Sequence, residues 1–222
     1  MQDHPSARQA HPLQNRVDPF GKICAIPARG ALMGNRGGRL HTPEQRVVRS
    51  WVSRRWITCR LTFRDRRRHV MGDSYTELFF MDEATALAAG HRPCFECRRA
   101  DAKAFAAAWA EAEGLETPLR ADRMDAILHR ERLERRAKRL HQIDYADLPA
   151  GAMVLFQGAP WLLREDSMLR WTFNGYAEAL PRLRAGRAQV LTPPGTLSAL
   201  RGGYAPASRF NPVRTNAGGR TV

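Results

Sequence analysis

Lysine and cysteine are scarce in this chain, and long apolar runs are missing. Only three of its 222 residues are lysine, although Lys and Arg together number 36. Four cysteines are too few for a disulfide-rich scaffold, so we expect a reducing compartment, the cytoplasm. No apolar stretch approaches the roughly 18 residues of a membrane helix, and no membrane partner is expected. The polar start of the chain, residues 1–11, has no apolar segment typical of a secretory signal.

Acidic residues are also few, and their shortage gives the chain a formal net charge of +14. A GC-rich genome favours arginine over lysine, but it does not explain an excess of cations over anions. The excess lies in residues 1–75, with net charge +10, and residues 150–222, with +6, whereas residues 76–149 carry −2. These basic ends predict a polyanionic partner, DNA or RNA. The alternative is unspecific basicity.

Local patterns predict a mixture of helices and short strands. Asp82 is suited to cap a helix and Gly90 to end it, and capping and periodicity together predict helices over 43–56, 82–89, 101–113, 121–142 and 196–200. Alternation and β-forming residues predict strands over 56–63, 75–81, 152–156, 161–163, 171–176 and 189–191.

The most specific motif is Cys94-Phe95-Glu96-Cys97. Two cysteines separated by two residues can bind one metal ion from a tight turn, and zinc is the usual ion. Pro93 precedes the turn and a helix is expected after it, which is typical of structural zinc sites. A redox pair is less favoured, because a thioredoxin-like motif follows a strand directly. Two inert buried cysteines are the remaining alternative.

The surrounding residues extend this motif. They read Phe79-Phe80, Glu83-Ala84 and then Ala88-Ala89-Gly90-His91-Arg92-Pro93-Cys94-Phe95-Glu96-Cys97-Arg98. This pattern resembles the downstream half of the zinc-binding domain of the Ada family of DNA alkylation repair proteins. The resemblance covers about residues 56–105 and implies zinc and a DNA-related function.

The upstream half of the family pattern is only partly present. The family has a Cys-x3-Cys pair about thirty residues earlier; Cys59 occupies the first position, and Phe63 stands at the second. The resemblance therefore implies Cys59, Cys94 and Cys97 as ligands and leaves the fourth open. His69 and Cys24 are equal candidates for it, with His41 or a water behind them.

In the Ada family a zinc-bound cysteine of the upstream pair accepts a methyl group from DNA phosphate. The resemblance offers Cys59 for that role. The chain has nothing like the family's DNA-reading helix-turn-helix or its second acceptor motif.

Arginines cluster around Cys59 and alternate with aromatic residues. Arginine pairs with phosphate, and aromatic rings stack on bases, so this segment is the preferred nucleic-acid surface. Its expected phosphate contacts are Arg54, Arg55, Arg60, Arg66, Arg67 and Arg68. The alternative is a solvated edge beside core tryptophans.

Two enzymatic alternatives stay open. Asp125 and His129 lie one helical turn apart, and with Glu131 they could hold a divalent ion or transfer protons in a metal-assisted nuclease. The plainer interpretation is a solvated helix with an Asp–His pair. A third possibility is a small-molecule enzyme whose zinc is purely structural.

Together these features predict an α+β fold with a zinc knuckle, a charged helix and a small C-terminal β unit. The expected organisation is a flexible arm over 1–15, a zinc-binding domain over 16–148, a β-rich unit over 149–204 and a loose basic tail over 205–222. The leading function is a zinc-stabilised protein that binds nucleic acid.

Overall fold

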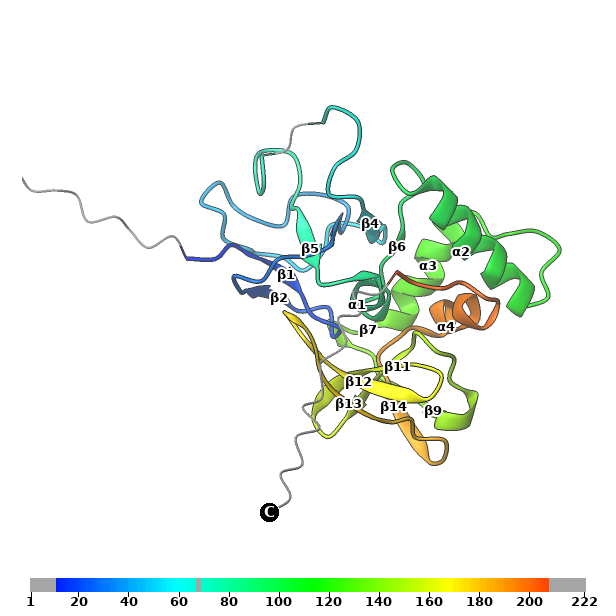
Figure 1. Cartoon of the computed structure of the whole chain (residues 1–222). Coiled ribbons are helices and arrows are strands. Elements are labelled where there is room, and N and C mark those ends of the chain that lie inside the picture. Colours follow the sequence, from blue (N-terminus) through cyan, green and yellow to red (C-terminus); the bar gives the residue numbers. More distant parts are fainter. Residues whose placement is uncertain (1–10, 67–68, 208–222) are drawn as a thin grey trace, which may run out of the picture.

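The computed structural model describes residues 11–66 and 69–207, which form an α+β fold with two six-stranded sheets (Figure 1). The first sheet has the strand order β2-β1-β5-β3-β4-β6 and mixes parallel with antiparallel pairs. Its strands are β1 (Gln14–Val17), β2 (Ile23–Ala25), β3 (Leu32–Asn35), β4 (Ile57–Cys59), β5 (Leu78–Phe80) and β6 (Arg92–Pro93).

The helix predicted over 43–56 is wrong, because these residues form turns and loop. Gln45 has a φ of 61°, a left-handed conformation that a helix does not contain. Val48 and Val52 are about half exposed, so the apolar spacing does not mark a buried face. The strands predicted over 56–63 and 75–81 exist only at β4 and β5, each three residues long.

The predicted terminal segments are partly built into the fold. Residues 1–10 lie outside the described part of the chain, but Gln14 and Asn15 of the predicted arm belong to β1. At the other end, the N–H of Ala207 donates to Glu83 Oε2 at 3.0 Å. The remainder of the predicted tail, 208–222, is outside the described residues.

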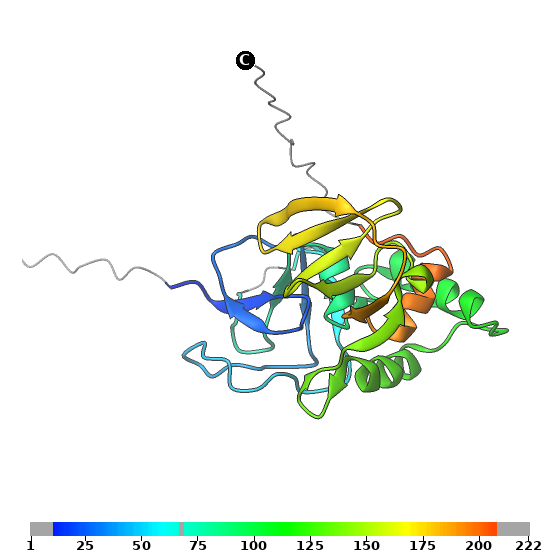
Figure 2. The same ribbon diagram turned by 90° about the horizontal axis from the view of Figure 1, so that it is seen from below.

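A short buried helix, α1 (Glu83–Ala88), lies between the two sheets (Figures 1 and 2). The prediction over 82–89 is confirmed, including its cap: Asp82 Oδ1 accepts the N–H of Thr85 at 2.9 Å. Ala86 packs into the core of the first sheet, and Ala84 packs against the second. Small side chains on both faces allow the two sheets to approach the same helix.

Three further helices pack beside the sheets: α2 (Arg99–Ala112), α3 (Ala121–Arg132) and α4 (Pro194–Arg201). The contact between α2 and α4 is close, since a Cβ at Gly195 would lie 2.1 Å from the Trp109 ring. Phe105 and Leu128 contribute to the same core. Within the described residues, no helix has the length and apolar character needed to cross a membrane.

The charged helix is shorter than predicted. It ends at Arg132, and the expected continuation to 142 forms the hairpin β7 (Leu133–Glu134) and β8 (Ala137–Lys138), followed by β9 (His141–Asp144). The residues between 134 and 139 offer no apolar face, and Arg135 has a φ of 57°. Helical propensity alone does not hold such a segment without packing.

The second sheet has the order β13-β12-β11-β10-β14-β9. Its remaining strands are β10 (Met153–Phe156), β11 (Ala159–Leu163), β12 (Ser167–Thr172), β13 (Gly175–Pro181) and β14 (Arg187–Val190). The strand predicted over 171–176 is not continuous: Trp171 and Thr172 end β12, Gly175 and Tyr176 begin β13, and the turn between them lies at 173–174. The predicted boundary at 148 falls inside a shared core, in which β10 and β11 side chains pack with α2 and α3.

We predict that Asp82→Ala lowers the free energy of unfolding by about 2–4 kcal/mol, measured by urea denaturation. The substitution removes the cap of α1 and leaves the buried hydroxyl of Tyr176, which donates to Asp82 Oδ2 at 2.7 Å, without that acceptor. Asp122→Ala is the control, because that carboxylate is 81% exposed. Equal effects of the two substitutions would contradict the role given to Asp82.

Candidate metal centre

Three cysteines from two separate segments meet at the edge of the first sheet. Cys59 ends β4, and β4 runs parallel to β6, which leads directly into Cys94. The N–H of Cys94 donates to the C=O of Thr58 at 3.0 Å. This pairing places Cys94 beside Cys59, although 35 positions separate them in the sequence.

The Cys94–Cys97 segment forms a tight turn whose backbone points at sulfur. The N–H of Glu96 donates to Cys94 Sγ at 3.4 Å, and the N–H of Arg98 donates to the C=O of Cys94 at 3.0 Å. The backbone N–H of Arg60 also donates to the sulfur of Cys97. Such N–H···S bonds stabilise thiolates, which are the form that binds metal.

The sulfur atoms of Cys59, Cys94 and Cys97 all lie within 4.8 Å of one another, and all three residues are buried. Four sulfurs around zinc at 2.3 Å would be about 3.8 Å apart, so a small contraction of this group satisfies tetrahedral geometry. The three cysteines could therefore hold a metal ion. Thiolates suit zinc, copper(I) and iron–sulfur chemistry, and the donor set alone does not choose among them.

The three thiols strongly perturb one another. Hydrogen bonds from Cys59 and Cys97 hold the pKa of Cys94 far below that of a free thiol. The same hydrogen bond to Cys94, together with burial, raises the pKa of Cys59. One thiolate is thus stabilised by its two neighbours, and metal binding would release the remaining protons.

Neither expected fourth ligand belongs to this group. Cys24 lies in β2, four strands away from β4, which corresponds to roughly 19 Å at the usual strand spacing. His69 is exposed and is not among the clustered ligand atoms. His41 is buried elsewhere, with Nδ1 at 2.6 Å from Thr76 Oγ1 and Nε2 at 3.0 Å from the C=O of Gly72.

A buried arginine that we did not single out from the sequence fixes the cysteine turn. Arg98 donates to Glu83 Oε1 at 2.7 Å, to Thr58 Oγ1 at 2.8 Å and to Asp101 Oδ2 at 2.8 Å. These bonds connect the turn to α1, β4 and α2. The available signal was the position of Arg98 directly after Cys97.

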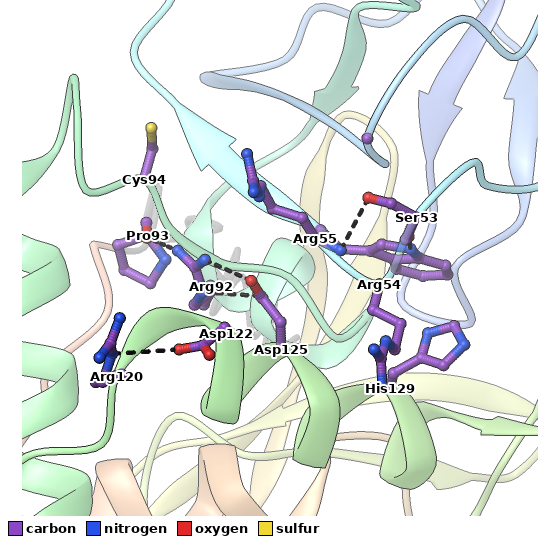
Figure 3. A network of polar contacts seen from close by, with 12 residues as sticks. Ser53, Arg54, Arg55, Arg92, Pro93, Cys94, Arg120, Asp122, Asp125 and His129 are labelled. Carbon is purple, nitrogen blue, oxygen red and sulfur yellow. Dashed lines mark hydrogen bonds and ion pairs between the residues drawn. The ribbon is translucent and has the colours of Figure 1, made fainter.

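The proposed acid–base residues of α3 do not converge. Asp125 accepts two hydrogen bonds from Arg92, at 2.9 and 2.7 Å, and this buried ion pair ties α3 to β6 (Figure 3). Glu131 instead accepts the N–H of Gly195 at 2.9 Å, while His129 Nδ1 lies 2.9 Å from the Arg132 guanidinium. In the described part of the chain, the only group of three or more potential ligands is the cysteine cluster.

Burial also shifts the titration of all three groups, and it raises the pKa of Asp125. It raises the pKa of Glu131, and it lowers the pKa of His129, to which Arg132 adds. A neutral histidine beside an arginine is consistent with a packing role. The contacts therefore favour a structural role for this helix, although the expected solvated Asp–His pair is wrong: Asp125 is buried and pairs with Arg92.

The arginines expected to contact phosphate are exposed where they are described. Arg54, Arg55 and Arg60 are exposed, and Arg66 forms an exposed ion pair with Glu96 next to the cysteine turn. Arg67 and Arg68 lie outside the described residues. Figure 3 shows the Arg55 side chain extending on the same side of the sheet edge as Cys94.

Comparison with known proteins gives no match: no family model, curated protein or solved structure resembles the chain closely enough to be assigned to it.

We predict that the purified protein binds about one equivalent of zinc and that Cys94→Ser lowers it below half an equivalent, measured by elemental analysis. Cys24→Ser is the matched control, because this thiol lies outside the cluster, and it should leave the zinc content unchanged. Equal loss from both variants, or zinc-free wild-type protein, would contradict the assignment.

We predict that Asp125→Ala destabilises the protein by about 3–5 kcal/mol in urea denaturation, because it leaves the buried Arg92 without its carboxylate. Asp122→Ala, one turn earlier and exposed, should change stability by less than about 0.5 kcal/mol. An Asp125→Ala variant of normal stability would show that the ion pair is not structural and would reopen a catalytic role.

Proposed function

We propose that this chain is a zinc-stabilised protein of the cytoplasm that binds DNA or RNA through arginines around the cysteine cluster. The observation that carries the proposal is the position of exposed arginines on the segments that form the cluster. Arg60 directly follows Cys59, and Arg55 precedes β4 by two residues. A metal ion that fixes β4 and the cysteine turn would also fix these side chains.

A broad cavity beside the cluster supports the same proposal. Its volume is about 1100 Å³, and its walls include Arg55, Cys94 and Arg120. Phe95 adds an aromatic surface to this wall. Three carboxylates also line it, each ion-paired with an arginine: Glu96, Asp122 and Asp125. A concave surface of this size with guanidinium groups and an aromatic ring suits a phosphate backbone with stacked bases.

The metal ion, when bound, supplies a rigid covalent-like link between β4 and the Cys94–Cys97 turn. The side chains of the protein recognise the nucleic acid, because their guanidinium groups neutralise its phosphates. The ion pair between Arg98 and Glu83 holds in place the backbone that carries these arginines. A reducing compartment keeps the three clustered thiols available as ligands. The cytoplasm meets that requirement.

We predict that the protein binds a labelled 20-nucleotide strand with an affinity that falls steeply with salt. Replacing two phosphate contacts by the double change Arg55→Ala and Arg60→Ala should weaken binding at least tenfold and reduce the slope of log K against log salt by about 1.4. Fluorescence anisotropy at several salt concentrations measures both quantities.

The control for this experiment carries the same charge change elsewhere. Arg184 and Arg187 are exposed and lie on or beside β14 in the second sheet, so their double replacement by Ala should leave the slope nearly unchanged. If both double variants lose the same affinity, binding depends on the net charge of the protein and not on the arginines around the cysteine cluster. Binding that is absent or independent of salt would refute the proposal.

A further inference from the structure

A second cavity, of about 570 Å³, lies on a different part of the molecule. It is bounded by β2, by the loop that leads into β4, and by the β7–β8 hairpin. Figure 2 shows this hairpin next to the light-blue loop that carries Trp51. The cavity volume falls within the usual range for small-molecule sites.

Three partly or fully buried cations line this cavity: Arg36, Arg132 and Lys138. Both arginines are only 1% exposed. Neither arginine nor Lys138 forms an ion pair with any carboxylate in the residues that the structure describes. The other two buried arginines, Arg92 and Arg98, each have one, so the lack of partners is peculiar to the cavity.

Neutral groups take up the hydrogen bonds of these cations. Arg36 donates to the C=O of Gly21 at 2.8 Å and to the C=O of Ser50 at 3.2 Å. Arg132 donates to the C=O of Gly90 at 2.8 Å and to the C=O of Arg54 at 2.7 Å, and Lys138 donates to the C=O of Ala88. These acceptors fix the positions of the charges without neutralising them.

Both guanidinium groups also pack against one indole. The central guanidinium carbons of Arg36 and Arg132 lie 3.8 and 3.9 Å from the ring centroid of Trp56. A cation over an aromatic face is attracted by about 0.5–2 kcal/mol, which is well short of what a buried carboxylate provides. The indole therefore positions two like charges that still repel each other.

Burying these charges is unfavourable, and it lowers the pKa of all three groups. Burial lowers the pKa of Arg36 to about 9, and burial together with repulsion from the neighbouring cations lowers the pKa of Arg132 to about 8 and that of Lys138 to about 7. Asp18 is the acidic neighbour of Arg36 and Lys138, but its Oδ1 accepts the N–H of Lys22 at 2.9 Å. An anion in the cavity would relieve the repulsion.

The rim of the cavity adds further features of a ligand site. Lys22, Arg49 and Arg136 line it and are exposed. Phe20 and Trp51 also line it, and both are partly exposed, so a flat ring could stack on either. No acidic side chain is found among the described residues that line the cavity.

We infer that this cavity binds the phosphate group of a nucleotide, with the phosphate against Arg36, Arg132 and Lys138 and the base against Trp51 or Phe20. The ligand could be a free nucleotide or the phosphorylated end of a nucleic-acid strand, because both offer the same phosphate and base. The inference does not depend on the metal centre or on the arginine surface proposed above.

Isothermal titration calorimetry of the full, zinc-loaded chain tests this inference. The probes are adenosine, adenosine monophosphate, and a ten-nucleotide strand with and without a 5′-phosphate. We expect adenosine monophosphate to bind at least tenfold more tightly than adenosine, or the phosphorylated strand at least tenfold more tightly than the unphosphorylated one. The first result identifies a free nucleotide and the second a strand end. Absence of both preferences would overturn the inference.

Two variants locate the binding. Lys138→Gln and Arg136→Ala should each weaken binding of the preferred phosphate probe, Lys138→Gln by at least tenfold, whereas Arg187→Gln, an equal charge change on the second sheet, should not. The unliganded Lys138→Gln protein should be at least as stable as the wild type, because it loses an unpaired charge. A less stable Lys138→Gln variant with unchanged binding would make the lysine structural and contradict the site.

The result of this calorimetry is independent of the result of the strand-binding experiment that tests the proposed function. If Arg55 and Arg60 do not bind strands, the preference for a terminal phosphate should still be observed, because neither arginine lines this cavity. Failure of the cavity would leave the salt-dependent binding of unphosphorylated strands intact.

Discussion

The ion pair between Glu83 and Arg98 is the contact on which the rest of the structure depends. Its atoms are 2.7 Å apart, and both side chains are almost fully buried. Arg98 follows the last cysteine of the cluster, while Glu83 begins the helix between the two sheets. Glu83 also accepts the hydroxyl of Tyr204 at 2.6 Å, so one carboxylate connects the cysteine turn, α1 and the C-terminal segment. A buried pair of this kind is favourable only when its remaining hydrogen bonds are satisfied, and here they are.

The buried arginines fall into two groups with different consequences. Arg92 and Arg98 have carboxylate partners and hold β6, α1 and α3 together around the cysteine cluster. Arg36 and Arg132 have carbonyl groups and an indole instead. Paired charges stabilise a fold, whereas unpaired ones reduce its stability and are retained where a ligand completes them. The arginines with carboxylate partners thus belong to a structural centre, and Arg36 and Arg132 belong to a candidate binding site.

The sequence predicted those parts of the fold that depend on local signals. Asp82 and Gly90 lie next to the helix that they bound, so α1 could be placed closely. Spacing and propensity predict helix over 43–56 and 133–142, but neither segment has a continuous apolar face to bury, and both form turns, loop or short strands instead. The aromatic residues of 171–176 are strong β formers and predict one strand, whereas a turn at 173–174 divides the segment between β12 and β13.

The residues of the candidate sites also differ in whether the sequence predicts them. Only two residues separate Cys94 from Cys97, so this pair is recognised from its spacing, whereas Cys59 follows only from the resemblance to the Ada family. That Arg36 and Arg132 share one indole could not be foreseen, because the sequence does not show which of many arginines are buried. The same limit applied to Asp125, whose partner Arg92 lies 33 positions away.

X-ray absorption spectroscopy at the zinc edge tests the central claim most directly, since it counts the sulfur neighbours of the metal in the intact protein. The cluster of Cys59, Cys94 and Cys97 predicts three sulfurs at about 2.3 Å and one nitrogen or oxygen. A spectrum with two sulfurs or fewer would contradict the site. Four sulfurs would require Cys24 and would contradict the strand order of the first sheet.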